Sequence, residues 1–317
     1  MTEPKTYTLE APGAVLHYDV RADDASTQPV LLIIGSPMGA SGFGALAEHF
    51  ADRTVVTYDP RGAERSKRTD GALATTVDEH ADDLHRLIFA LDAGPVDIFA
   101  SSGGAVNALA LAARHPEQVR TLVAHEPPAV QALSDRERAL AANVDIHQTY
   151  QRSGFGPAMA KFLTLVSLQG PIPDDYADRP APDPAAFGLP AEDDGSRDDA
   201  LLGLNMISLS QYRHDFTALR AVPTRIVVGV GAQSGQLLGR AWGRGRGRAA
   251  RDDAGNLPRR PRRIPPGRRS LRRRTGRLRR HPAHGPSRLT GYRTARPAGI
   301  RTQDRTEAEP PRPSSPS

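Results

Sequence analysis

Apolar and polar residues follow two different spacings in the first 128 residues. Residues 6–22 alternate between the two kinds on both sides of Pro12-Gly13, which predicts a β-hairpin. Elsewhere the apolar residues form short continuous runs, which are typical of strands buried on both faces of a parallel sheet. These runs lie at residues 30–34, 54–58, 96–100 and 119–124.

Helix-like segments separate the apolar runs. One begins with the capping box Thr76-Val77-Asp78-Glu79, and others are expected from residue 40 to about 52 and from 103 to 115. The capping-box helix has one apolar face, formed by Ala81, Leu84, Leu87, Ile88 and Leu91. The β-α-β-α-β alternation predicts an α/β fold with a mostly parallel, doubly wound sheet and right-handed crossovers.

The strand alternation stops after residue 128. Helix-like segments and a loop rich in Pro and Asp occupy residues 129–220, and an apolar run at 225–230 returns to the sheet. We interpret 129–220 as a helical lid that shapes an apolar pocket, with a plain helical cover as the alternative. The expected organisation is a first core part at 1–128, the lid, a core strand at 221–240 and a tail at 241–317.

Composition excludes several classes of protein. The 317 residues contain no cysteine, so neither disulfides nor thiolate metal sites are available. The N-terminus is polar and no apolar stretch approaches the length of a membrane span. We therefore expect a cytoplasmic protein that acts on a small molecule, away from membranes, without a cofactor or a metal.

A possible nucleophile stands at the end of the run at 96–100. In Ala100-Ser101-Ser102-Gly103-Gly104 a strand turns directly into a helix, and small residues surround Ser102. A sharp strand-to-helix turn exposes a serine hydroxyl and leaves nearby amide groups free for an oxyanion. The alternative is a glycine-rich turn without chemistry.

The motifs at the strand ends resemble those of the α/β-hydrolase superfamily over residues 5–240. Ser102 stands in the nucleophile elbow, with Ala100 replacing the usual first glycine. Gly35-Ser36-Pro37 occupies the place of the oxyanion loop, although Ile34 replaces its usual histidine. Two further turns are similar to those of the superfamily, Asp59-Pro60-Arg61-Gly62 and His125-Glu126-Pro127-Pro128. The resemblance implies the α/β-hydrolase fold, Ser102 as nucleophile, and the N–H groups of Ser36 and Gly103 as the oxyanion hole.

The acid of a catalytic triad has one candidate, Glu126. It follows the strand next to that of Ser102, and neighbouring strands lie only about 4.8 Å apart. Some members of the superfamily carry their acid there. Most carry it after the following strand, where this chain has Gly231-Ala232-Gln233. Glu126 could instead be a salt-bridged or capping carboxylate.

No histidine can be assigned as the base. His17 lies in the hairpin, and a strand position for His125 would turn it away from the site. The superfamily supplies its base beyond residue 240, where only His281 and His284 occur, among Arg and Pro. We expect solvated side chains for the histidines on or beside predicted helices, namely His49, His80, His85, His115, His147 and His214.

The tail differs from the rest of the chain in charge. Residues 240–317 hold 23 arginines, no lysine and 5 acidic residues, whereas residues 1–239 hold 19 basic and 31 acidic residues. One interpretation is a disordered basic tail that binds nucleic acid non-specifically through phosphates. The favoured interpretation is translation of a GC-rich gene in the wrong frame.

A shift of one base supports the frame interpretation. With CGN codons for Arg, residues 256–265 shifted forward permit Ile-Phe-Pro-Gly-Asp-His-Ala-Gly-Phe-Leu. This is similar to the closing strand and the Gly-Asp-His loop of a hydrolase. The expected function is serine-dependent cleavage of a small ester, lactone or related acyl substrate, with activity lost if the histidine is missing. The alternative is a non-catalytic truncated hydrolase or an Arg-rich polyanion binder.

Overall fold

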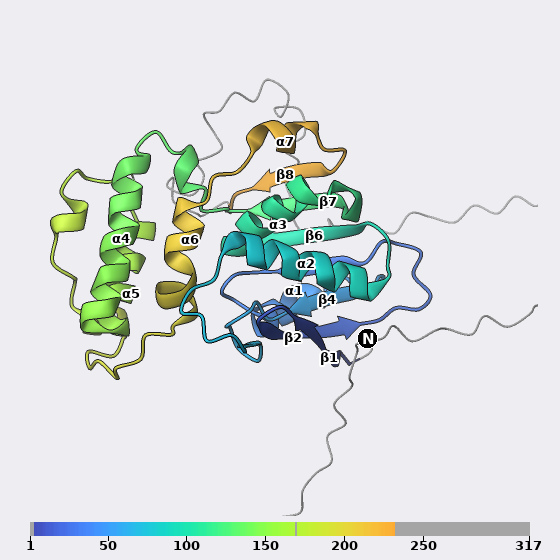
Figure 1. Cartoon of the computed structure of the whole chain (residues 1–317), viewed down its shortest axis with the longest axis horizontal. Coiled ribbons are helices and arrows are strands. Elements are labelled where there is room, and N and C mark those ends of the chain that lie inside the picture. Colours follow the sequence, from blue (N-terminus) through green and yellow to red (C-terminus); the bar gives the residue numbers. More distant parts are fainter. Residues whose placement is uncertain (1–2, 169, 232–317) are drawn as a thin grey trace, which may run out of the picture. The chain divides into compact units, whose positions relative to one another are not determined.

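The strands form one eight-stranded sheet in the computed structural model, which describes residues 3–168 and 170–231 (Figure 1). Their order is β1-β2-β4-β3-β6-β7-β8, with β5 paired to β2. The strands are β1 Lys5–Ala11, β2 Ala14–Arg21, β3 Leu31–Ile34, β4 Val55–Tyr58, β5 Lys67–Arg68, β6 Val96–Ser101, β7 Val119–His125 and β8 Arg225–Gly229.

The pairing confirms the predicted α/β class. Strands β4, β3, β6, β7 and β8 are parallel, and the hairpin β1–β2 joins them antiparallel through β4. Ser101 at the end of β6 pairs with His125 at the end of β7. The carboxyl ends of the central strands therefore meet at one edge, where the motifs were expected.

The longer helices are α2 Val77–Leu91, α3 Gly103–Arg114, α4 Arg136–Ser153 and α5 Phe155–Val166, and the shorter ones are α1 Gly44–Ala47, α6 Met206–Gln211 and α7 Phe216–Ala221. The described chain also contains the short 3-10 helices η1 Ala40–Phe43, η2 Pro116–Gln118, η3 Val130–Ala132, η4 Tyr176–Asp178 and η5 Pro184–Phe187. A π-helix, η6, spans Ala200–Asn205.

The helix expected from residue 40 to about 52 is much shorter than predicted. Only η1 and α1 form there, and α1 ends at Ala47. Gly42 lies within η1 and Gly44 within α1, and each glycine inside a helix costs about 1 kcal/mol relative to alanine, which weakens the segment.

Helix α2 begins as the capping box predicts. The Thr76 hydroxyl accepts from the N–H of Glu79 over 3.1 Å, and the Glu79 carboxylate accepts from the N–H of Thr76 over 2.7 Å. The predicted apolar face packs on the sheet: Ala81, Leu84, Leu87 and Ile88 are buried, and Leu91 is half-buried. Together with α3 it covers Leu32, Ile98 and Leu122 of the central strands. Full burial of such a side chain contributes about 1.5–3 kcal/mol.

The helices between β7 and β8 have an apolar core of their own. Ile146 and Tyr150 of α4 are fully buried against Leu202 of η6 and Met206 of α6. Figure 1 shows α4 and α5 side by side. The lid function and the expected domain boundaries stay predictions, and residues 232–240 and the tail 241–317 lie outside the described residues.

Asn205 connects this helical segment to the start of α2 and the segment just before it. Its Oδ1 accepts from the hydroxyl of Thr75 over 2.6 Å and lies 2.8 Å from Nε2 of His80. The Thr75 N–H also donates to the carbonyl of Leu204 over 2.9 Å. Because these polar groups are buried, the contacts fix the end of the segment to α2.

Candidate active site

Ser102 occupies a strained bend between β6 and α3. Its backbone has φ 53° and ψ −128°, a region that non-glycine residues enter only at a cost of about 1–3 kcal/mol. The bend is held by two hydrogen bonds of 2.9 Å, from the Ser102 N–H to the His125 carbonyl and from the Ala105 N–H to the Ser102 carbonyl. The Ser102 side chain is exposed. This is the geometry that a serine nucleophile needs.

The start of α3 packs directly on the loop after β3. A Cβ on Gly103 would lie 2.6 Å from the Ser36 carbonyl oxygen, and one on Gly104 would lie 2.7 Å from Cα of Gly35. Such distances exclude a side chain at either position, so the two backbones touch. Ser36 is buried, and its hydroxyl has no hydrogen-bond partner among the described residues. The structure therefore brings Ser36 and Gly103 together beside the bend.

Two carboxylates hold the loop that contains Ser36. Asp59, at the end of β4, accepts from the N–H of Ala40 over 2.8 Å. Glu64 accepts from the N–H of Gly39 over 3.0 Å and from the hydroxyl of Ser41 over 2.9 Å. The position of Asp59 at a strand end was visible in the sequence. The contacts of Glu64 with Gly39 and Ser41 were not visible in the sequence, because they depend on a turn that places residue 64 at φ 46°.

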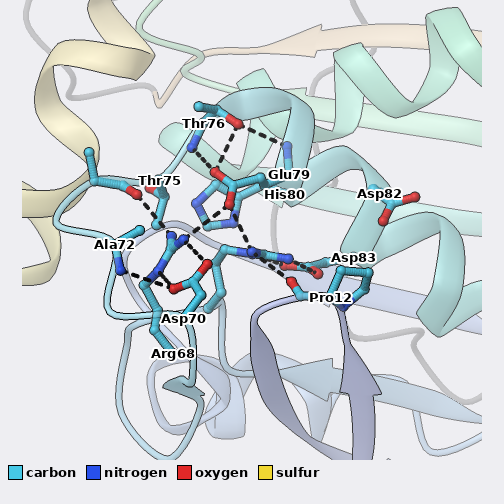
Figure 2. Close-up of polar contacts among 12 residues, drawn as sticks. Pro12, Arg68, Asp70, Ala72, Thr75, Thr76, Glu79, His80, Asp82 and Asp83 are labelled. Atoms are coloured by element: carbon cyan, nitrogen blue, oxygen red, sulfur yellow. Dashed lines mark hydrogen bonds and ion pairs between the residues drawn. The ribbon is translucent and has the colours of Figure 1, made fainter.

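Arg61 of the Asp-Pro-Arg-Gly turn binds two carboxylates of α2. Its guanidinium is buried, donates twice to Asp83 over 2.7 and 2.6 Å, and donates to Glu79 over 3.0 Å. Figure 2 shows both carboxylates on α2, with the Arg68 guanidinium between Glu79 and Asp70. This arginine therefore has a structural role between the turn and α2.

Glu126 is hydrogen-bonded to the end of β8. Its backbone also has a positive φ of 48°, and its N–H donates to the carbonyl of Gly229 over 2.9 Å. Its carboxylate accepts from the N–H of Gly231 over 2.8 Å and lies 3.9 Å from Nε2 of His125. Ser102 and Glu126 each follow one member of the Ser101–His125 pair, so they stand at neighbouring strand ends.

Among the described histidines, His125 has a backbone carbonyl that accepts from the Ser102 N–H, and its imidazole contacts the other serine. Its Nδ1 lies 3.0 Å from the Ser101 hydroxyl, and its ring stacks on Phe99 with the centroids 5.8 Å apart. No hydrogen bond joins a histidine in the described part of the chain to the Ser102 hydroxyl. His281, His284 and Gln233 lie outside the described residues.

The prediction of a solvated side chain is wrong for His80. This residue is fully buried, and burial lowers its pKa to about 4 while Asn205 binds its Nε2. Burial lowers the pKa of His214 to about 4 as well. Both remain neutral near pH 7, because burial disfavours the charged ring.

Neither a membrane-spanning helix nor a metal site emerges from residues 3–231. No described helix is both long and apolar enough to cross a membrane. No three His, Asp or Glu side chains of this region cluster in a way that could hold an ion.

Sequence comparison connects the chain to known hydrolases. Residues 28–165 match the family model of the alpha/beta hydrolase fold. The uncharacterized hydrolase YraK of Bacillus subtilis is 43% identical over 131 residues, which are 41% of this chain and 47% of that protein. A proline iminopeptidase of Xylella fastidiosa is 33% identical over 97 residues, 30% of this chain and 31% of that protein. The chain thus spans less than half the length of these relatives.

Solved structures share the fold over a longer stretch. A carboxylesterase structure from Nitrososphaera gargenis has a TM-score of 0.53 and 19% identity, covering 74% of this chain and 83% of that one. A thermophilic esterase from Thermogutta terrifontis has a TM-score of 0.52 and 19% identity, covering 76% and 85%. At 19% identity, the similarity to these structures shows a shared fold alone.

Proposed function

We propose that this chain, whose residues 28–165 match the family model of the alpha/beta hydrolase fold, hydrolyses a small ester, lactone or related acyl substrate with Ser102 as nucleophile. The observation that carries the proposal is the strained, exposed position of Ser102 between β6 and α3. A non-glycine residue persists at such a bend only where the surroundings impose it, and strain of this kind concentrates at functional sites.

The proposed reaction begins with attack of the Ser102 hydroxyl oxygen on the acyl carbon. The negative charge that develops on the carbonyl oxygen is stabilised by the N–H groups of Ser36 and Gly103. The close contact between Gly103 and the Ser36 carbonyl supports this assignment, because it fixes the two backbones relative to each other. A preorganised donor of this type contributes about 3–4 kcal/mol to stabilisation of the transition state.

Glu126 is the proposed acid, and its position at the end of the neighbouring strand supports that role. The described histidines offer no base to Ser102, since His125 contacts Ser101 instead. A serine that loses its base retains only residual catalysis. We therefore expect this chain to hydrolyse its substrate slowly.

The substrate class rests on the fold neighbours. Two of them are described as a carboxylesterase and an esterase, which supports cleavage of a carboxylic ester by this chain. A serine nucleophile also argues against the superfamily members that cleave epoxides or halides, which use an aspartate at the same place.

The test is hydrolysis of p-nitrophenyl acetate and butyrate by the full chain. Ser102→Ala should lower kcat/KM at least about 10-fold, because the proposed nucleophile is removed. Ser167→Ala is the matched control. That exposed serine directly follows α5, and its hydroxyl donates to the carbonyl of Leu163 in the last turn of the helix. Equal kcat/KM for Ser102→Ala and the control would refute the assignment.

A further inference from the structure

A second serine at the same strand end already has an imidazole. The Ser101 hydroxyl lies 3.0 Å from Nδ1 of His125, within hydrogen-bonding distance. The contact follows from the sheet, because Ser101 and His125 are paired residues on adjacent parallel strands and extend their side chains to the same face. A hydroxyl and an imidazole in this relation have the arrangement of a nucleophile and its base.

The other ring nitrogen faces a carboxylate. Nε2 of His125 lies 3.9 Å from Oε1 of Glu126, and that oxygen is fixed by the N–H of Gly231. With Nδ1 accepting the Ser101 proton, the neutral ring carries its own proton on Nε2, toward Glu126. The imidazolium formed when Ser101 gives up its proton then has a negative charge nearby, which favours the transfer.

The ring is also held in place and reachable by a small molecule. It stacks on Phe99, two residues before Ser101 on the same face of β6. The His125 side chain is 31% exposed, that of Glu126 is 15% exposed, and Ser101 is half-buried. Ser101, His125 and Glu126 thus form a hydroxyl–imidazole–carboxylate array that Ser102 does not enter.

We infer that Ser101 is a second acyl-accepting serine, with His125 as its base and Glu126 as the residue that stabilises the charged ring. The Ser101 oxygen bonds to the acyl carbon of an ester while the bond to the leaving alkoxide breaks. The hydroxyl proton passes to Nδ1 of His125 and then to the alkoxide, which leaves as the alcohol. Water hydrolyses the acyl-serine by the reverse proton path.

The test is covalent labelling of the full chain with diisopropyl fluorophosphate, which phosphorylates a reactive serine oxygen and releases fluoride. Fragmentation of the labelled peptide between residues 101 and 102 assigns the adduct to one serine. We expect an adduct on Ser101 that persists in Ser102→Ala and disappears in Ser101→Ala. His125→Gln should slow labelling of Ser101 by about 100-fold or more, the scale of general-base catalysis. His49→Gln, a change at an exposed histidine of another loop, should leave the rate unchanged.

The outcomes separate this inference from the function proposed for Ser102. An adduct on Ser102 alone would overturn the role of Ser101 and support Ser102. An adduct on Ser101 alone would support the inference and count against Ser102 as nucleophile. Labelling of Ser101 that His125→Gln does not slow, or no label on Ser101, would overturn the inference. Mapping the adduct on the labelled wild-type chain identifies the reactive serine even if a variant fails to fold.

Discussion

The buried carboxylate of Asp59 accepts a hydrogen bond from the N–H of Ala40 over 2.8 Å, which ties the end of β4 to the loop after β3. Arg65 donates to the other oxygen of the same carboxylate. The loop after β3 also contains Ser36, whose N–H is a proposed oxyanion donor. Its orientation therefore depends on a side chain from a different strand.

Asp59→Ala should lower the free energy of unfolding by about 1–3 kcal/mol, because the Ala40 N–H loses its acceptor in a buried place. Urea denaturation followed by circular dichroism measures the change. Asp59→Asn keeps an oxygen for Ala40 and should lose less than Asp59→Ala. Equal losses in the two variants would contradict an effect that depends on the accepting oxygen.

Gly104→Ala should destabilise the protein by about 1–3 kcal/mol, the usual cost of a forced overlap in a packed core. The new Cβ would lie 2.7 Å from Cα of Gly35, and a backbone cannot rotate away as a side chain can. Gly44→Ala is the matched control. Its Cβ would have open space, and its φ of −52° is helical, so that variant should gain up to about 1 kcal/mol. Thermal unfolding of both variants checks the difference, and an unchanged melting temperature in Gly104→Ala would disprove the contact.

Most strands of the sheet could be predicted because the apolar runs that form them are local signals. The hairpin, the capping box at Thr76 and the parallel central strands all formed at the expected places. The short β5 at Lys67–Arg68 carries no such signal, since it is polar and pairs through backbone groups with β2. The helix expected up to residue 52 shows the opposite error, because the glycines between 39 and 44 outweigh the apolar spacing.

The candidate site was less accessible to sequence analysis. The bend at Ser102 followed from small residues next to a strand end, which is a local pattern. The contact between Ser101 and His125 depends on the register of two strands 24 residues apart, and spacing alone does not fix a register. The contact of His80 with Asn205 likewise joins residues 125 positions apart in the chain.

Acidification should weaken the fold through His80. Burial lowers its pKa from 6.5 to about 4. Between pH 6.5 and 4, the His80 side chain is therefore protonated in the unfolded chain and neutral in the folded chain. Its contribution is fully present above pH 6.5 and is lost as the pH falls to 4, up to about 3 kcal/mol in total. Urea denaturation at pH 7, 6, 5 and 4 measures the slope.

His80→Gln should flatten this slope, because glutamine can still donate to Asn205 but does not titrate. Part of the slope will remain, since the pKa of His214 is also lowered to about 4. His49→Gln is the control, because that exposed histidine should leave the slope as it is. An identical pH dependence in wild type and His80→Gln would show that His80 does not stay neutral in the folded chain.

The nucleotides that encode residues 238–265 decide whether a base has been lost to a change of frame. If it has, the codons of residues 256–265 moved forward by one base will encode a Gly-Asp-His sequence after a short apolar strand. A chain expressed from that frame should hydrolyse p-nitrophenyl esters on the order of 10²–10⁴-fold faster than this chain, because a general base would then face Ser102. Ser102→Ala should abolish the gain in that chain, whereas Ser101→Ala should leave most of it, since the restored base would serve Ser102. A stop codon in the shifted frame, or a gain that Ser102→Ala does not remove, would contradict the frame interpretation and leave the arginine-rich segment to be explained as encoded.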